Sequence, residues 1–214
     1  NLASAISRID SNHFAFLGVP VSIKDLYGVN GYKTRAGTPK ELPSKWEAQG
    51  PIINTLTSHH SLITGKTHTV EFAFGGVGMN PHRGTPINPW DGTEHRVPGG
   101  SSSGAGVSLC TGTAALALGT DTAGSVRIPA SVTGNVGLKT TKNRWSTEGI
   151  VPLSNSFDTP GILTHTVDDC IYAFKELDKI SLYNNKDKEL NVDPDIDFTF
   201  TTYDWFFDKC DDQI

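Results

Sequence analysis

Residues 98–140 constrain the fold of this chain more than any other segment. Two runs of glycine and hydroxyl residues stand at either end of a stretch of small apolar residues: residues 99–104 (GGSSSG) and residues 119–127 (GTDTAGSVR). Glycine lets the backbone approach a ligand closely, and a hydroxyl between glycines can act as a nucleophile or proton carrier. The segment therefore predicts a close-packed structure with reactive serines in its turns.

The small residues between the two runs predict regular structure. Residues 105–113 favour a helix and residues 114–119 a buried strand. We expect a turn over residues 119–124, after which Pro129 suits the first turn of another helix. Ser125 would then lie at a strand-to-helix junction.

A second strand is predicted upstream, within residues 17–27. Val19, Val21 and Ile23 alternate there, and Lys24 comes near the strand exit. The period of two places Lys24 on the face opposite Val21 and Ile23. We therefore expect a lysine on an interior strand.

Further elements follow from local patterns. Pro51 begins a predicted short helix, and Thr166 is the predicted N-cap of a helix that runs to about Lys179. The remaining expectations are a short buried strand over residues 62–65, a long connection over 74–99, a surface excursion over 184–197 and a short strand over 198–201. Together these elements predict an α/β fold.

Composition excludes several function classes. The 214 residues carry a net charge of −5 with Lys and Arg scattered, which gives no direct signal for nucleic acid or an anionic membrane. No apolar run approaches a membrane span, and the first residues lack the layout of a signal peptide. Cys110, Cys170 and Cys210 are widely spaced, which favours a reducing compartment. We expect a cytoplasmic protein, although removal of a leader stays open because residue 1 is not Met.

A serine nucleophile needs a base, and the histidines supply no informative pattern. Seven are present, and none has zinc-site spacing, so no metal is expected. Ser102 formally satisfies G-x-S-x-G, but a turn-rich segment precedes it where that motif needs a strand. Residues 119–126 resemble a phosphate-binding loop without its Lys.

A lysine can serve as the base where burial lowers its pKa. Lys24 is the best placed candidate, and Lys66, which follows the strand predicted over residues 62–65, is a rival by the same logic. An ion pair between Lys24 and Asp25 is the structural alternative. The pattern alone leaves these possibilities open.

Several separated motifs together resemble the amidase signature family. They are residues 18–25 (GVPVSIKD), 99–104, 119–129, 134–139 (GNVGLK), 149–154 (GIVPLS) and 156–163 (SFDTPGIL). The resemblance covers most of residues 17–175 and follows the family's order. It implies a mixed twisted β-sheet covered by α-helices, with residues 1–214 forming one partial amidase domain. The family's N-terminal helical region and C-terminal half are largely absent.

The resemblance also implies a Ser-Ser-Lys triad. Ser125 would be the nucleophile, Ser101 the bridging serine on a cis peptide, and Lys24 the base. The implied oxyanion hole consists of the backbone N–H groups of Thr122, Ala123, Gly124 and Ser125. No metal or organic cofactor is implied.

Other residues of the motifs would support this site. Ser102 becomes a supporting residue, and Asp121 and Arg127 would fix the loop by hydrogen bonds. The family often has Gly where this chain has Ala123, but the backbone N–H is unchanged by the methyl group. These roles come from the resemblance.

The implied activity is hydrolysis of a small-molecule amide through a serine acyl-enzyme. A second chain completing the fold, or a homodimer, is a possible partner. Two alternatives stay open: an amidotransferase A-type subunit, and a non-catalytic scaffold-type fragment that binds a partner through an incomplete sheet edge.

Overall fold

The computed structural model describes residues 14–184 and contains one five-stranded mixed sheet. The strands are β1 (Pro20–Lys24), β2 (Leu62–Thr67), β3 (Leu116–Asp121), β4 (Val136–Lys139) and β5 (Thr159–Thr164). Their order is β2-β1-β3-β5-β4, with β1 parallel to both β2 and β3, and β5 antiparallel to both β3 and β4. The predicted mixed sheet is confirmed. The surface excursion over 184–197 and the strand over 198–201 lie almost entirely outside the described residues.

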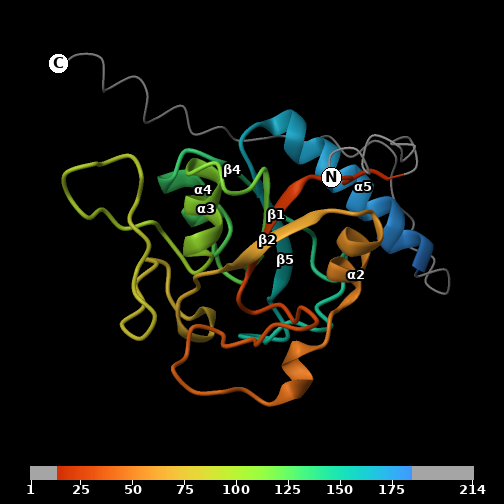
Figure 1. Cartoon of the computed structure of the whole chain (residues 1–214), viewed down its shortest axis with the longest axis horizontal. Coiled ribbons are helices and arrows are strands. Elements are labelled where there is room, and N and C mark those ends of the chain that lie inside the picture. Colours follow the sequence, from red (N-terminus) through yellow and green to blue (C-terminus); the bar gives the residue numbers. More distant parts are fainter. Residues whose placement is uncertain (1–13, 185–214) are drawn as a thin grey trace, which may run out of the picture. The chain divides into compact units, whose positions relative to one another are not determined.

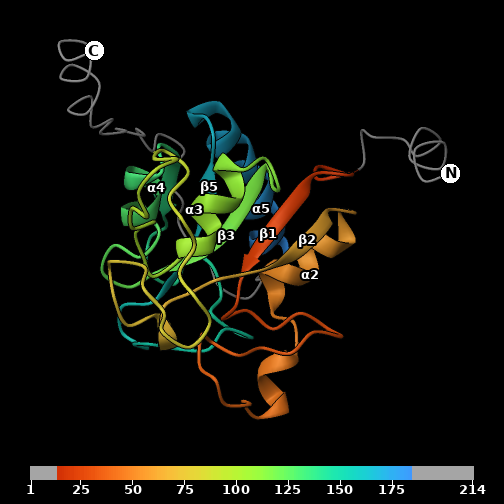
Figure 2. The same ribbon diagram turned by 60° about the vertical axis from the view of Figure 1, so that its left-hand side comes forward.

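Helices cover both faces of this sheet (Figure 1). The helices are α2 (Pro51–Ser58), α3 (Ser103–Cys110), α4 (Arg127–Val132) and α5 (Val167–Asn184), with short 3₁₀ turns at Ser44–Glu47 and Glu71–Ala73. Figure 2 shows α3 and α4 on one side of the sheet and α5 on the other.

Alternation along the strands explains the two layers. Val21 and Ile23 of β1 join the core cluster that contains residues of α2 and α5. On the opposite face Ser22 is buried, and its hydroxyl lies 2.8 Å from that of Ser108 on α3. Lys24 shares this second face and is fully buried. The helix layer over that face thus removes the Lys24 amine from water.

Two local expectations are wrong. Residues 62–65 form part of β2, but this is an edge strand, and Leu62 is 52% exposed. The turn expected from Gly119 begins later, because β3 continues through Asp121 and pairs with β5 up to Thr159. Tertiary pairing overrides the local turn signal there.

The pairing of β1 with β2 contains one register shift. Val21 pairs with Ile63, but Ser22 pairs with Gly65, so that Thr64 is the extra residue of a bulge. Lys66 consequently pairs with Ile23.

The capping prediction for α5 is confirmed. The Asp169 N–H donates to the Thr166 hydroxyl at 3.1 Å, and that hydroxyl donates to the Asp169 carboxylate at 2.7 Å.

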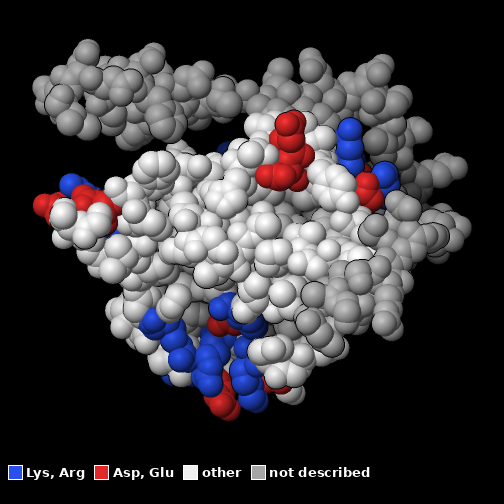
Figure 3. Space-filling view, turned by 45° about the horizontal axis from the view of Figure 1, so that its top comes forward, with Lys and Arg blue, Asp and Glu red and all other residues white. Residues whose placement is uncertain are grey.

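Within residues 14–184, no helix has the length and apolar character needed to cross a bilayer. The face drawn in Figure 3 is largely uncharged, with basic side chains gathered at its lower margin and acidic ones among them.

Candidate active site

Lys24 ends β1, which lies between β2 and β3 in the sheet, and its hydrogen-bond partners are uncharged. Its Nζ donates to Ser101 Oγ at 2.7 Å, to Thr120 Oγ1 at 2.8 Å and to the Thr120 carbonyl at 3.4 Å. Among the described residues, no carboxylate forms an ion pair with Lys24. The alternative of an ion pair with Asp25 is therefore wrong, because Asp25 pairs with Lys66 instead, at 2.7 Å.

This environment changes the protonation of Lys24. Burial lowers the pKa of Lys24 to about 7, and the negative charges of Asp121 and Asp158 oppose that fall. A lysine with this pKa is substantially neutral at physiological pH. Its lone pair is then available to accept a proton.

Ser101 is fully buried beside Lys24, and the Gly100–Ser101 peptide bond is cis. Its carbonyl accepts the Val70 N–H at 3.1 Å, and the Gly100 N–H donates to the Gly76 carbonyl at 2.8 Å. A Cβ at Gly100 would lie 2.7 Å from the Gly78 nitrogen, so only glycine fits this close approach. The glycine-rich run thus holds Ser101 between two backbone segments.

Ser125 lies in the turn between β3 and α4 and is 9% exposed. Its carbonyl accepts the Ser102 N–H at 3.1 Å, a contact that joins the two glycine-rich runs. Within the described part of the chain, the Ser125 hydroxyl forms no hydrogen bond. Ser102 is itself buried and shares 3.4 Å contacts with the Thr120 backbone.

Asp121 organises the turn that carries Ser125. Its buried carboxylate accepts the Gly124 N–H at 2.7 Å and the Val126 N–H at 3.2 Å. Arg127 adds two guanidinium hydrogen bonds, each 3.0 Å long. Burial acts to raise the pKa of Asp121, but these hydrogen bonds lower it overall. The carboxylate is therefore ionised.

Of the four backbone N–H groups expected to bind an oxyanion, one already donates a hydrogen bond to Asp121. Gly124 donates to Asp121, so its N–H is already engaged. The N–H groups of Thr122, Ala123 and Ser125 donate no hydrogen bond within residues 14–184. Three of the four are thus available for a ligand.

Two further residues belong to the site and were not predicted from the sequence. Thr120 receives hydrogen bonds from Lys24, and Asp158 accepts one from the Thr122 hydroxyl at 2.5 Å. The turn predicted over residues 119–124 concealed Thr120, and alternation would assign it to the face of Leu116 and Leu118, opposite Lys24. Asp158 is distant in sequence, and no local pattern signals its contact.

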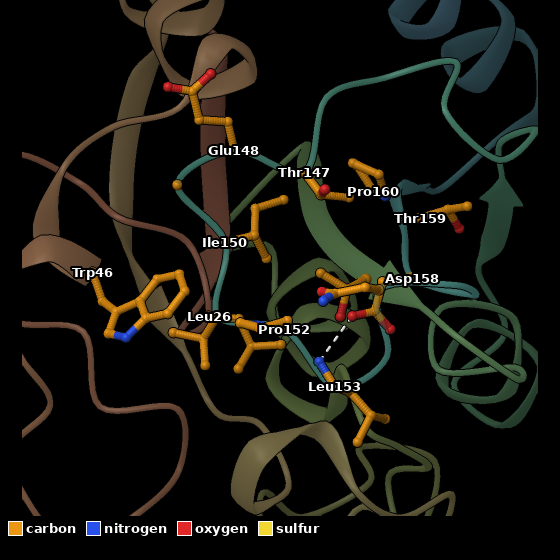
Figure 4. A pocket seen from close by; sticks show the side chains of 14 residues that line it. Leu26, Trp46, Thr147, Glu148, Ile150, Pro152, Leu153, Asp158, Thr159 and Pro160 are labelled. Carbon is orange, nitrogen blue, oxygen red and sulfur yellow. Dashed lines mark hydrogen bonds between the residues drawn. The ribbon is translucent and has the colours of Figure 1, made fainter.

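A pocket of about 210 Å³ adjoins these residues (Figure 4). Its wall combines Thr120 and Asp158 with the loop that covers residues 147–155, while Trp46 lies on the side opposite Asp158. Lys24, Ser101 and Ser125 are not among the residues that line this pocket, and Thr120, which lines it and contacts Lys24, connects the two.

Comparison with known proteins identifies the family. The family model named Amidase matches residues 3–204. The chain belongs to the amidase family. It is 64% identical over 162 residues to the 2-amino-5-chloromuconic acid deaminase of Comamonas testosteroni, a match that covers 76% of this chain and 35% of the deaminase. The resemblance seen in the motifs is therefore confirmed.

More distant amidases show the same relation. The indoleacetamide hydrolase of Pseudomonas savastanoi is 38% identical over 157 residues, which cover 73% of this chain and 34% of the hydrolase. An amidase crystal structure aligns with a TM-score of 0.75 at 38% identity, covering 84% of this chain and 42% of that one. The amidase fold is thus confirmed, and the chain spans about a third of the length of these curated relatives.

Proposed function

We propose that the protein containing this chain hydrolyses a carbon–nitrogen bond of a small-molecule amide, with Ser125 as the nucleophile and Ser101 and Lys24 as its proton relay. The observation that supports this most is Lys24 itself. It is fully buried, has a pKa lowered to about 7, and lies 2.7 Å from the hydroxyl of Ser101. A buried amine with neutral partners is suited to act as a base.

The contacts of Lys24 suggest how the relay is oriented. A neutral amine has two hydrogens and one lone pair. The carbonyl and hydroxyl of Thr120 can accept the two hydrogens, which turns the lone pair toward Ser101. Ser101 can then donate its proton to Lys24 while it accepts the proton of Ser125.

In the proposed reaction, Ser125 Oγ attacks the amide carbon as this relay removes its proton. The free N–H groups of Thr122, Ala123 and Ser125 stabilise the oxyanion. Lys24 returns the proton through Ser101 to the leaving nitrogen, the carbon–nitrogen bond breaks, and an acyl-enzyme remains. Water, activated by the same relay, hydrolyses the ester and regenerates Ser125.

Two kinds of relative suggest narrower substrates. The relative at 64% identity is named a deaminase of 2-amino-5-chloromuconic acid, which favours substrates that release ammonia. An amidotransferase role, with partner chains, is the second candidate because several relatives are named as glutamyl-tRNA(Gln) amidotransferase subunits. Ammonia release from 2-aminomuconate-type acids, primary carboxamides and glutamine would distinguish these candidates.

A fluorophosphonate probe tests the nucleophile directly. We expect one adduct, mapped to Ser125 by peptide mass spectrometry, and none in Ser125→Ala. Ser58→Ala is the matched control, since the Ser58 hydroxyl donates only to the Thr55 carbonyl on α2. A folded wild-type chain that stays unlabelled would overturn the assignment and favour the non-catalytic scaffold alternative.

A further inference from the structure

The Asp158 carboxylate joins two segments that lie far apart in the sequence. One oxygen accepts the Thr122 hydroxyl at 2.5 Å, at the start of the turn that carries Ser125. The other accepts the backbone N–H groups of Leu153 and Ser154, at 2.8 and 2.9 Å. Both oxygens are thus used, and each holds a different segment.

Lys142 secures the same loop without contacting this carboxylate. Its Nζ donates to the carbonyls of Asn155 and Asp158, at 2.8 and 2.9 Å. Among the described residues, no cation forms an ion pair with the Asp158 side chain. Within that same part of the chain, the contact with Thr122 is therefore the one side-chain link from this carboxylate to the Ser125 turn.

The loop held by Asp158 also forms the pocket wall. Leu153 and Asp158 line the pocket together with Thr120, which contacts Lys24 (Figure 4). A change at Asp158 would consequently alter the pocket wall and the turn together. Geometric errors of about 1 Å at such a site can cost about 10²-fold in rate.

We propose that Asp158 is a positioning residue that couples the pocket loop over residues 152–158 to the Ser125 turn through the hydroxyl of Thr122. It touches neither the nucleophile nor the base, and acts by fixing Thr122 and the pocket wall in one arrangement. The catalytic part of this inference rests on the proposed function, whereas the coupling of the two segments does not.

The charge of Asp158 provides a second way to test its positioning role. Asp121 and Asp158 are the two carboxylates whose charges oppose the effect of burial on Lys24. Removal of the Asp158 charge should therefore lower the pKa of Lys24, so that the acid limb of the pH–rate profile moves to lower pH.

Hydrogen exchange tests the coupling without any need for activity. Thr122→Val removes the hydroxyl, and we expect exchange of the Leu153 and Ser154 amides to become about tenfold faster. Thr122→Ser, which keeps the hydroxyl, should restore their protection. Thr166→Val is the matched control, because it removes a comparable hydroxyl–carboxylate bond, to Asp169, at the start of α5. Unchanged exchange at Leu153 and Ser154 in Thr122→Val would overturn the coupling.

Labelling of Ser125 by the fluorophosphonate probe tests the consequence for reactivity. We expect Asp158→Ala to slow labelling about 10²-fold. Asp158→Asn should recover much of that rate, because the amide can accept from the loop and donate to the Thr122 oxygen. The acid limb of the pH profile of labelling should shift to lower pH in this variant. Asp169→Asn removes a charge outside the site and serves as the control.

The outcomes separate the two proposals. If Asp158→Ala and Asp158→Asn label like Asp169→Asn with the wild-type pH profile, the positioning role is wrong. If the wild-type chain is folded but unlabelled, the proposed function fails, while the exchange experiment still decides whether Asp158 couples the two segments.

Discussion

Two lysines on neighbouring strands have opposite surroundings. Lys24 on the interior strand β1 contacts only hydroxyl and carbonyl oxygens, whereas Lys66 on the edge strand β2 contacts Asp25 at 2.7 Å and Thr34 at 2.7 Å. Burial lowers the pKa of both, but Asp25 opposes that effect at Lys66. Burial alone therefore does not make a base, because the partner decides whether the ammonium form persists.

Removal of each amine in turn tests this difference between the two lysines most directly. Lys24→Ala should reduce amide hydrolysis by about 10²–10⁴-fold, because the relay loses its base. Steady-state kinetics at pH 7 measure the effect. A fall of less than about threefold would mean that another group accepts the proton.

The pH dependence gives the next largest effect. The active form of Lys24 is neutral, so the rate should rise as pH increases through about 7 and fall roughly tenfold per unit well below it. The pH profile of kcat/KM measures this.

The free energy of unfolding should also depend on the protonation of Lys24, and it should increase with pH. The unfolded chain binds the proton of Lys24 up to a pKa near 10.5, whereas the folded chain releases it at about 7. Burial of Lys24 therefore costs most below pH 7, and stability rises as pH increases from 7 to 10.5. Lys24→Met should remove this dependence in denaturant unfolding experiments, and an unchanged slope would argue against a shifted pKa.

Lys66→Met should lower stability but leave the rate of hydrolysis nearly unchanged. Loss of the amine leaves the Asp25 carboxylate without its cation, and we expect destabilisation of about 1–3 kcal/mol. Hydrolysis should stay near the wild-type rate, since Lys66 contacts no residue of the candidate site. Urea unfolding and kinetics on the same preparation measure both; a loss of rate comparable with that of Lys24→Ala would revive Lys66 as the base.

The smallest expected effect comes from a change to Asp25, the ion-pair partner of Lys66. Asp25→Asn removes the charge that opposes the effect of burial, so the pKa of Lys66 should fall further. Nitrogen-detected NMR titration of the Lys66 side chain would follow this change, with the Lys24 signal as an internal reference. A pKa that does not move would show that Asp25 has little influence on Lys66.

The sequence predicted the elements whose signals are local. Alternation of Val21 and Ile23 located β1, and Thr166 marked the start of α5. Strands β4 and β5 were not predicted as strands, because β5 begins with Thr159 and Pro160 and is completed by pairing with distant β3. A strand defined by its neighbours carries little signal of its own.

The residues of the candidate site also differ in how far the sequence could predict them. Ser101, Ser125 and Lys24 were named from a resemblance, and the structure places Lys24 beside Ser101. Spacing alone could not choose between Lys24 and Lys66, because the decisive groups, Thr120 and Asp25, act through contacts across the sheet and in a neighbouring turn. Asp158 was missed for the same physical reason.

The bulge at Thr64 separates the two cations. Without the extra residue, the register that pairs Val21 with Ile63 would continue and set Lys66 directly opposite Lys24. Paired residues of parallel strands project to the same face, so two ammonium groups would compete for one buried space. Instead Lys66 pairs with Ile23 and projects to the face of Asp25. One inserted residue on an edge strand thus insulates the buried amine from a second positive charge.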